Sequence, residues 1–391
     1  MHPALQYCRD VLAGRIVACR YVRLACERHM HDLAHGRERG LRFSPLAAQH
    51  AIDFVHTFCR HVKGRWAKEY DDQHRPRDTR IQLTPASQFF FWCLFGWMRQ
   101  TPDGWRRRFR TCYKEVARKN AKTTEAAAIG LYLFWADEEP GCECYTTATT
   151  RDQAKLCHNL AVKMVEKDPD LSREIDYFRG VSTLAIDATA SSFTPLSADH
   201  NTLDGLNIHG AICDEVHEWR GEKGRGMWEV IETATGSRDQ SLQVAITTAG
   251  YDRQSICYDL REYAAKVLKG FNHPDGVKDD SFFALIYTID RAQDWPDLVP
   301  LDAPAGRKGV REDDWKDPAT WIKANPNLGI SKDIDTMMQQ RDKALAMPTA
   351  VNGFLRKHLD VWVSQASRWI PMELWDQNNT GEVYVRNGGD L

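Results

Sequence analysis

The sequence predicts an α/β fold, in which helices flank a mainly parallel sheet. Between about residues 82 and 290, short apolar and β-branched runs alternate with longer segments of helical composition, as expected for strands joined by crossover helices. The runs 210–215 and 242–250 are apolar nearly to their ends, which is typical of strands buried on both faces. A chain of 391 residues, 42% of them hydrophobic, can bury a large core, and we expect one main domain with subdomains.

The first element of a candidate site is a strand followed by a loop and a helix. Residues 110–116 alternate and carry β-forming side chains, whereas residues 124–135 are rich in Ala and Leu and predict a largely buried helix. The loop between them reads Val-Ala-Arg-Lys-Asn-Ala-Lys-Thr from 116 to 123. It has the Lys-Thr ending of the phosphate-binding pattern G-x-x-x-x-G-K-[ST], but Val116 and Ala121 replace the glycines.

The order of strand, loop and helix is nevertheless the one that phosphate binding requires. The loop N–H groups and the positive end of the helix would hold phosphate. Lys122 would reach the β- and γ-phosphates, and the Thr123 hydroxyl would ligate Mg²⁺. The alternative is a surface Lys-Thr pair at an ordinary helix start.

Two later strands end in polar residues that complete such a site. Asp214 and Glu215 end the buried run 210–215, and would support Mg²⁺ and polarise the attacking water, respectively. Thr247 and Thr248 lie near the end of the next strand, where their hydroxyls can sense the γ-phosphate. Each of these two motifs alone also fits a strand that ends in a solvated turn. Together with the loop at 116–123, and in this order, they favour an ATPase with a P-loop NTPase fold.

From about Gln82 onward the chain closely resembles the large terminase subunit of tailed double-stranded DNA phages. The resemblance implies a RecA-like (ASCE) P-loop core with a small helical lid, which hydrolyses ATP to move double-stranded viral DNA through the portal into the procapsid. The blocks that carry it are Gln88, Phe95–Trp97, Arg107–Arg110, Arg118–Thr123, Ala148–Ala154, Asp204–Asn207, Asp214–His217, Thr247–Gly250 and Trp321–Gly329.

The same resemblance assigns further roles to residues around the site. Gln88 would contact adenine, and Arg118 would contact the γ-phosphate or couple to Glu215. Nucleotide binding would also involve Lys119, Asn120, Ala121, Lys122, Thr123, Thr124, Thr247 and Thr248, with Thr123 and Asp214 holding Mg²⁺. The family often has Gly where Ala121 stands, and Ala tolerates a positive φ less well than Gly does.

A ring ATPase also needs an arginine that one subunit supplies to its neighbour's nucleotide. Arg238 is our first choice because it lies in a turn just before the Thr247 strand. Arg225, in the glycine-rich stretch 221–226, is the other candidate.

The expected organisation is a helical region at 1–63, an ATPase core at 64–330 that begins with a charged, turn-rich arm, and a lid or linker at 331–391. An amphipathic helix is expected at 334–346, ended by Met347-Pro348. Large terminases also carry an RNase-H-like nuclease, but no nuclease pattern is evident after Trp375. We therefore expect that domain to be absent or truncated, and ATP hydrolysis without DNA cleavage.

Composition and resemblance together indicate partners and location. The net charge of −2 gives no global nucleic-acid footprint, so DNA contact requires a local basic face. Eleven irregularly spaced Cys and no N-terminal signal indicate free thiols in a reducing cytoplasm, and no apolar run is long enough for a bilayer. By resemblance, the partners are double-stranded DNA, the portal and procapsid, the small terminase subunit and copies of this chain in a ring, a pentamer on the procapsid. The chain would work in the host cytoplasm and would dock transiently on the viral procapsid.

Two other functions fit the motifs. A helicase or other nucleic-acid remodeller on the same scaffold would separate strands, with ATPase activity stimulated by single strands. A portal or capsid adaptor with a dead nucleotide site, suggested by the missing glycines, would bind nucleotide without turnover.

Overall fold

The computed structural model describes residues 1–198, 205–270, 276–304 and 306–364. Its centre is an eight-stranded sheet in the order β11-β4-β10-β9-β5-β8-β7-β6. The six strands from β11 to β8 are parallel, and β7 and β6 continue the sheet antiparallel. The strands are β4 (Thr111–Glu115), β5 (Glu143–Ala148), β6 (Asp176–Phe178), β7 (Thr183–Ile186), β8 (Ser191–Ser197), β9 (Ile208–Asp214), β10 (Leu242–Thr247) and β11 (Phe282–Ile286).

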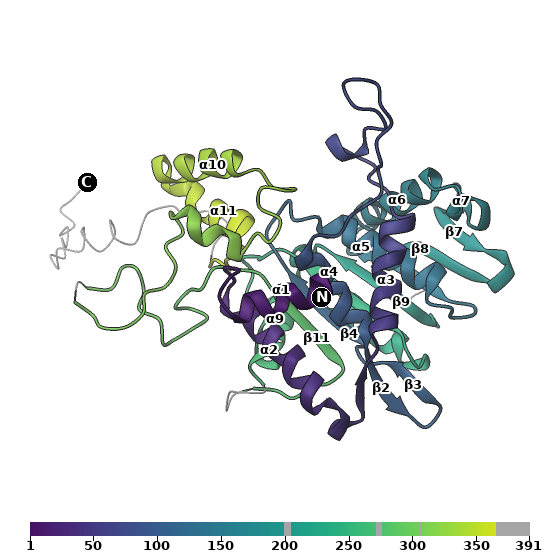
Figure 1. Ribbon diagram of the computed structural model, residues 1–391, viewed down its shortest axis with the longest axis horizontal. Coiled ribbons are helices and arrows are strands. Elements are labelled where there is room, and N and C mark those ends of the chain that lie inside the picture. The colour runs from purple at the N-terminus through teal and green to yellow at the C-terminus, as the bar shows by residue number, and fades with distance from the viewer. Residues whose placement is uncertain (199–204, 271–275, 305, 365–391) are drawn as a thin grey trace, which may run out of the picture.

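Helices cover both faces of this sheet, which confirms the expected α/β fold (Figure 1). On one face lie α4 (Pro85–Gly96), α5 (Lys122–Leu131) and α6 (Arg151–Lys167), and on the other α8 (Gly221–Ala234) and α9 (Ile256–Lys269). The helix expected at 124–135 is α5 extended by a π-helical turn, η3 (Tyr132–Ala136). Every residue of β10, and every residue of β9 before Asp214, is buried, as their apolar sequences predict.

The N-terminal region is helical, with one exception. Its helices are α1 (Pro3–Leu12), α2 (Arg20–His35) and α3 (Pro45–Phe58), and their buried residues share one hydrophobic core with the sheet. The exception is β1 (Leu41–Phe43), which pairs with β2 (Trp97–Thr101), which in turn pairs with β3 (Gly104–Arg107). The charged arm that follows α3 contains η2 (Arg65–Ala67) and projects from the body (Figure 1).

A small helical subdomain, called the lid below, comprises residues 318–364. It contains η7 (Pro318–Lys323), α10 (Ile334–Ala346) and α11 (Pro348–Leu359), and α10 has the bounds expected from the sequence. Pro348 starts α11, because a proline fits the first turn of a helix but not its interior. The lid has a second hydrophobic core, to which Ile289, Trp321, Met337 and Phe354 contribute.

The remaining short elements connect the larger ones. They are η1 (Gly36–Arg39), α7 (Leu171–Glu174), η4 (Asp187–Thr189), η5 (Val216–Glu218) and η6 (Thr235–Ser237). In the described parts of the chain, no helix has both the length and the apolar character needed to cross a membrane.

Candidate functional site

The strand order brings the three sequence motifs together at one edge of the sheet. β10 lies between β4 and β9, pairing Thr247 with Glu115 and Ile246 with Asp214. All three strands are parallel, so their carboxyl ends, and the residues that follow them, meet at the same edge. This is the edge at which parallel α/β sheets usually bind ligands.

The loop at 116–123, called the phosphate loop below, leads directly from β4 into α5. Ala121 is the N-cap residue of α5 and adopts a left-handed conformation, with φ +64° and ψ +16°. Lys119 also has a positive φ, of +70°. A left-handed L-residue costs roughly 1–2 kcal/mol, so Ala121 holds the conformation for which the family often uses Gly. Val116 has no positive φ, and the first glycine of the pattern is not needed here.

Lys122 points its ammonium into the space between the loop and the acid pair. Its Nζ donates to the Thr248 hydroxyl at 2.6 Å and to the Val116 carbonyl at 3.3 Å, and lies 3.9 Å from Glu215 Oε1. The side chain is buried, so its charge is held near the loop rather than in solvent. This is the position from which a lysine can reach a bound phosphate.

The two acids have opposite electrostatic environments. Burial raises the pKa of Asp214 to about 7, helped by the charge of Glu215, although Lys122 and a hydrogen bond with Thr123 act against the rise. Burial would also raise the pKa of Glu215, but a hydrogen bond with His217 and the charges of Lys122, His217 and Arg118 lower it to about 2. Glu215 is therefore ionised near neutral pH. Its backbone is left-handed, with φ +52°, a strain that is often found at functional sites.

His217 joins the acid pair to the neighbouring strand. Its Nδ1 lies 3.1 Å from Glu215 Oε2, and its Nε2 lies 3.3 Å from Glu218 Oε1. Its backbone N–H donates to the Thr247 hydroxyl at 3.0 Å. Burial would lower the pKa of His217, but the two glutamates raise it above its ordinary value. His217 therefore contacts both Glu215 and Thr247 of β10.

The lid contacts the phosphate loop through asparagines whose role the sequence did not reveal. Asn120 Nδ2 donates to Asn325 Oδ1 at 2.9 Å, and Asn327 N–H donates to Asn120 Oδ1 at 3.2 Å. Ser331 Oγ donates to the Lys119 carbonyl at 2.7 Å. Lys332 Nζ donates to Asn325 Oδ1 at 2.7 Å, and burial lowers the pKa of this lysine to about 7. The only available signal was the block Trp321–Gly329, which does not indicate what it contacts.

The lid also binds the segment that follows β10. The Ala249 N–H donates to Asp360 Oδ1 at 2.7 Å. A Cβ added to Gly250 would lie 2.9 Å from the Trp362 ring, so this close approach requires glycine. The residues after Thr247 and Thr248 are therefore attached to the lid.

The other predicted nucleotide-binding residues lie on α4, in the phosphate loop and on α5. Gln88, on α4, donates from Nε2 to the Leu83 carbonyl at 2.9 Å. Thr84–Ala86, just before it, line a cavity of about 150 Å³ together with Tyr287, at the end of β11. Arg118 is exposed, and its backbone N–H donates to the Lys357 carbonyl of α11 at 3.0 Å. Thr124 lies in the first turn of α5.

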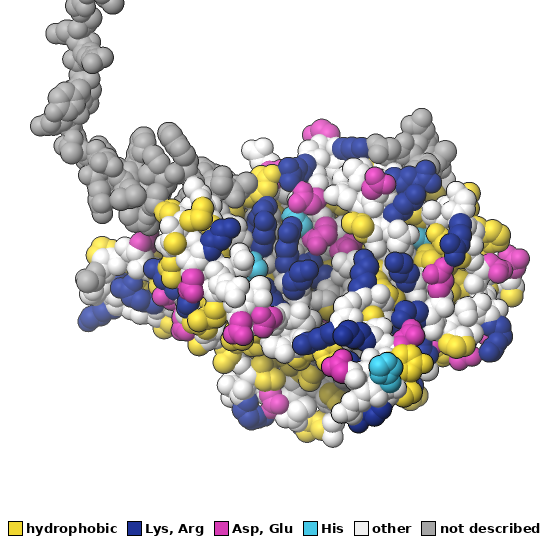
Figure 2. Space-filling model, turned by 90° about the horizontal axis from the view of Figure 1, so that it is seen from above, with side chains coloured by type: hydrophobic (Ala, Val, Ile, Leu, Met, Phe, Trp, Pro, Cys, Tyr) yellow, Lys and Arg dark blue, Asp and Glu magenta, His cyan; other side chains and the backbone are white. Residues whose placement is uncertain are grey.

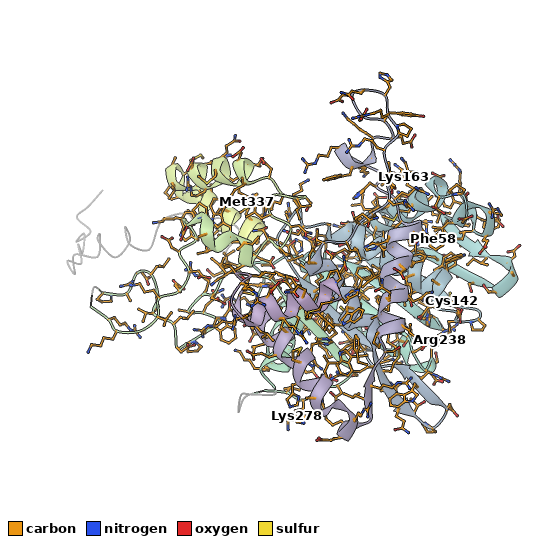
Figure 3. All side chains as sticks on the ribbon, in the orientation of Figure 1. Phe58, Cys142, Lys163, Arg238, Lys278 and Met337 are labelled. Carbon is orange, nitrogen blue, oxygen red and sulfur yellow. The ribbon has the colours of Figure 1, made fainter. Side chains whose placement is uncertain are left out.

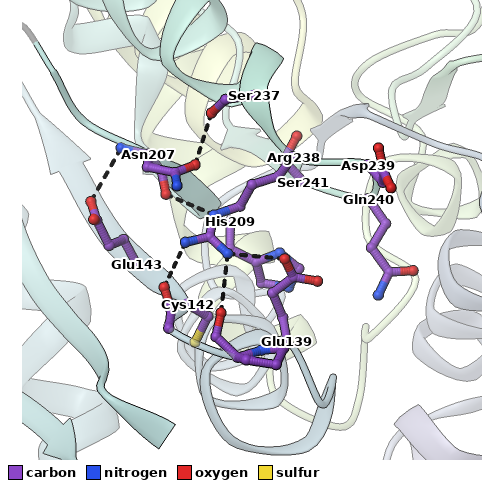
Figure 4. A network of polar contacts seen from close by, with 12 residues as sticks. Glu139, Cys142, Glu143, Asn207, His209, Ser237, Arg238, Asp239, Gln240 and Ser241 are labelled. Carbon is purple, nitrogen blue, oxygen red and sulfur yellow. Dashed lines mark hydrogen bonds and ion pairs between the residues drawn. The ribbon is translucent and has the colours of Figure 1, made fainter.

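Arg238 does not lie at this site. It lies at the amino edge of the sheet near Cys142, on the opposite side of the molecule from Met337 in the lid (Figure 3). Its guanidinium donates to Glu139 Oε1 at 2.9 Å and to the carbonyls of Asn207 at 2.9 Å and Gly141 at 2.5 Å (Figure 4). These contacts occupy the side chain within its own subunit, which argues against the predicted role at a neighbour's nucleotide.

Arg225, the other candidate, is partly exposed on α8 and paired with Asp259 at 2.8 Å. The structure thus brings together Lys122, Thr123, Asp214, Glu215, Thr247 and Thr248. It does not identify the arginine that one subunit would supply to the nucleotide of its neighbour. Asp204, from one of the blocks of resemblance, and residues 365–391, which include Trp375, lie outside the described residues.

Two family models match the chain. The model "Terminase large subunit, ATPase domain" matches residues 85–266, and "Terminase large subunit, endonuclease domain" matches residues 310–387. The first match contains the whole site from the phosphate loop to the segment after β10. The second does not support the expectation that this chain lacks nuclease sequence and nuclease activity.

Individual relatives agree with the first match. The large terminase subunit of Enterobacteria phage HK97 is 27% identical over 262 residues, covering 67% of this chain and 46% of that protein. Protein YmfN of Escherichia coli (strain K12) is 33% identical over 172 residues, covering 44% of this chain and 32% of YmfN. The crystal structure of the HK97 large terminase has the same fold, with a TM-score of 0.61 and 24% identity, covering 84% of this chain and 58% of that chain. The chain thus spans less than half of either curated relative.

Proposed function

We propose that the chain is a large terminase subunit, which hydrolyses ATP to drive double-stranded viral DNA through the portal into the procapsid. The observation that carries this proposal is the convergence of Lys122, Asp214 and Glu215 at the carboxyl edge of three adjacent parallel strands. The matched ATPase-domain model includes all three residues.

The residues of the site fit Mg²⁺ bound together with ATP. The Thr123 hydroxyl lies close enough to the Asp214 carboxyl to act on its pKa, and both offer the oxygen ligands that Mg²⁺ prefers. Bound there, Mg²⁺ would neutralise phosphate charge. Lys122 and the loop N–H groups would hold the β- and γ-phosphates.

Glu215 would orient the attacking water, because it is ionised and fixed by His217. Thr247 and Thr248 would report the loss of the γ-phosphate, since one contacts His217 and the other contacts Lys122. The attachment of Ala249 to Asp360 would pass that change to the lid, whose movement would displace a surface that grips DNA.

The proposed partners follow from the family rather than from contacts in this structure. They are double-stranded DNA, the portal and procapsid, the small terminase subunit, and further copies of this chain in a ring, a pentamer on the procapsid. The proposed location is the host cytoplasm, with transient docking on the procapsid.

The test compares Lys122→Ala with Lys163→Ala, a variant of an exposed lysine on α6 that is labelled in Figure 3. We expect Lys122→Ala to abolish ATP turnover without unfolding the chain, because it removes the cation that faces the phosphates. Lys163→Ala should behave as wild type. Near-normal turnover by Lys122→Ala would refute the site assignment.

A further inference from the structure

We propose that Arg356, on α11 of the lid, is a further phosphate-binding residue, which holds the terminal phosphoryl group of bound ATP together with Arg118 and Lys357. The inference rests on the proposed function and adds a residue that makes the lid itself respond to the γ-phosphate. It predicts that Arg356 distinguishes ATP from ADP.

The last turn of α11 lies directly against the phosphate loop. The Lys357 carbonyl accepts from the Arg118 N–H at 3.0 Å. The next carbonyl, of His358, accepts from Asn325 Nδ2 at 2.8 Å and from Lys332 Nζ at 3.3 Å. These bonds fix the backbone that carries Arg356, so its side chain starts from a defined position beside the loop.

The Arg356 guanidinium lies on the segment that follows β10. Its Cζ is 5.2 Å from the centroid of the Tyr251 ring, and Tyr251 directly follows Gly250. The Arg356 Nε is buried and has no hydrogen-bond partner among the described residues. Burial and the nearby Arg118 charge both lower the pKa of Arg356. The guanidinium therefore stacks on Tyr251, while its buried Nε–H has no hydrogen-bond partner among the described residues.

Glu218 attracts the charge of Arg356, and Arg118 attracts that of Glu215, but neither acid forms an ion pair with these arginines. Among the described residues, Arg118, Arg356 and Lys357 form no ion pair within 4.0 Å. Glu215 is engaged by Lys122 and His217, and Glu218 by His217 and Arg220. Figure 2 looks down on the side of the molecule that carries the lid, and shows Lys and Arg side chains across this face with Asp and Glu side chains interspersed among them.

An anionic phosphoryl group would supply the ion pair that these cations lack. A partly buried cation without a paired counter-charge is unfavourable, and the guanidinium fork binds phosphate oxygens bidentately. Arg118 comes from the phosphate loop, whereas Arg356 and Lys357 come from the lid. A γ-phosphate would therefore join loop and lid, and its loss would leave three like charges facing one another.

The experiment measures the dissociation constants of a non-hydrolysable ATP analogue and of ADP, both with Mg²⁺. The variants are Arg356→Gln, Arg356→Lys, and the control Arg341→Gln on α10, where the guanidinium is 2.7 Å from Asp342. Arg356→Gln should weaken binding of the ATP analogue about tenfold or more, about 1.4 kcal/mol, and change ADP binding less than about threefold. Arg356→Lys should recover part of this selectivity, and Arg341→Gln should leave both constants unchanged.

Equal ratios of the two dissociation constants in wild type and Arg356→Gln would overturn the proposal. So would an unchanged ratio accompanied by weaker binding of a short DNA duplex, because the bound anion would then be a DNA backbone phosphate. The ratio is independent of general unfolding, which would weaken ADP and the ATP analogue alike. Lys122→Ala tests the proposed function separately, since that variant should lose turnover whatever the result at Arg356.

Discussion

Asn325 links the lid to the phosphate loop, and its removal should have a large and local effect. The side chain is 0% exposed and takes part in four hydrogen bonds. Its Oδ1 accepts from Asn120 at 2.9 Å and Lys332 at 2.7 Å, and its Nδ2 donates to the carbonyls of Trp321 at 2.9 Å and His358 at 2.8 Å.

The expected cost of Asn325→Ala follows from these contacts. Each bond contributes roughly 0.5–1.5 kcal/mol net, and a buried donor left without a partner costs roughly 1–3 kcal/mol. Asn120 and Lys332 are both buried and both lose an acceptor. We therefore expect a loss of about 3–6 kcal/mol, which is comparable with the total stability of many domains. The lid should detach before the sheet unfolds, because its hydrophobic core is separate.

Hydrogen exchange of α10 and α11 and limited proteolysis measure this local opening, and thermal unfolding measures the whole chain. The control is Asn207→Ala, because Asn207 is exposed and its side chain accepts one bond, from Ser237 at 2.8 Å. Exposed substitutions of this kind usually change stability by less than about 0.5 kcal/mol. If Asn325→Ala leaves the lid as protected from exchange as Asn207→Ala does, the lid is not held by these bonds and the reasoning is wrong.

Two further predictions concern backbone strain and buried charge. Ala121→Gly should relieve roughly 1–2 kcal/mol of left-handed strain, offset by roughly 0.4–1 kcal/mol of added unfolded-state entropy. It should therefore slightly raise the melting temperature and preserve ATP turnover. Ala190→Gly, at φ +53° far from the site, is the matched control for stability, and a clear loss of turnover in Ala121→Gly alone would contradict this account. Burial, followed by the charge of Glu115, raises the pKa of Asp360 in the folded chain well above its usual 3.8. Asp360 therefore stabilises the folded chain fully below pH 3.8, and this stabilisation is lost as the pH rises through the pKa of the folded state. Asp360→Asn, which keeps an acceptor for Ala249 N–H, should flatten this decline in thermal unfolding scans from pH 5 to 9; an unchanged decline would show that Asp360 is not its source.

Local patterns predicted the parts of the molecule that depend on local physics. The strand before the phosphate loop, the acid-ended strand and the helix at 334–346 follow from periodicity and from proline. The lid contacts could not be predicted, because Asn120 and Asn325 are separated by 205 residues and neither lies in a pattern that indicates its partner. The choice of Arg238 stays a prediction, and its place away from the phosphate loop of its own chain follows from the sequence order. A residue just before a parallel strand lies at the amino edge of the sheet, whereas the phosphate loop follows a strand and lies at the carboxyl edge.

The lid contacts also explain how a phosphate loop can form without its usual glycines. Two of its residues, Lys119 and Ala121, have positive φ, and such strain persists only where the surroundings determine the backbone strongly. The surroundings here are the lid: Ser331 binds the Lys119 carbonyl, and Asn327 binds the carbonyl and side chain of Asn120. A glycine-rich loop can take its shape alone, whereas this loop has its shape imposed by the element that would move during turnover. Loop shape and lid position are therefore coupled, and a lid displaced by the loss of phosphate would also loosen the cradle that held the nucleotide.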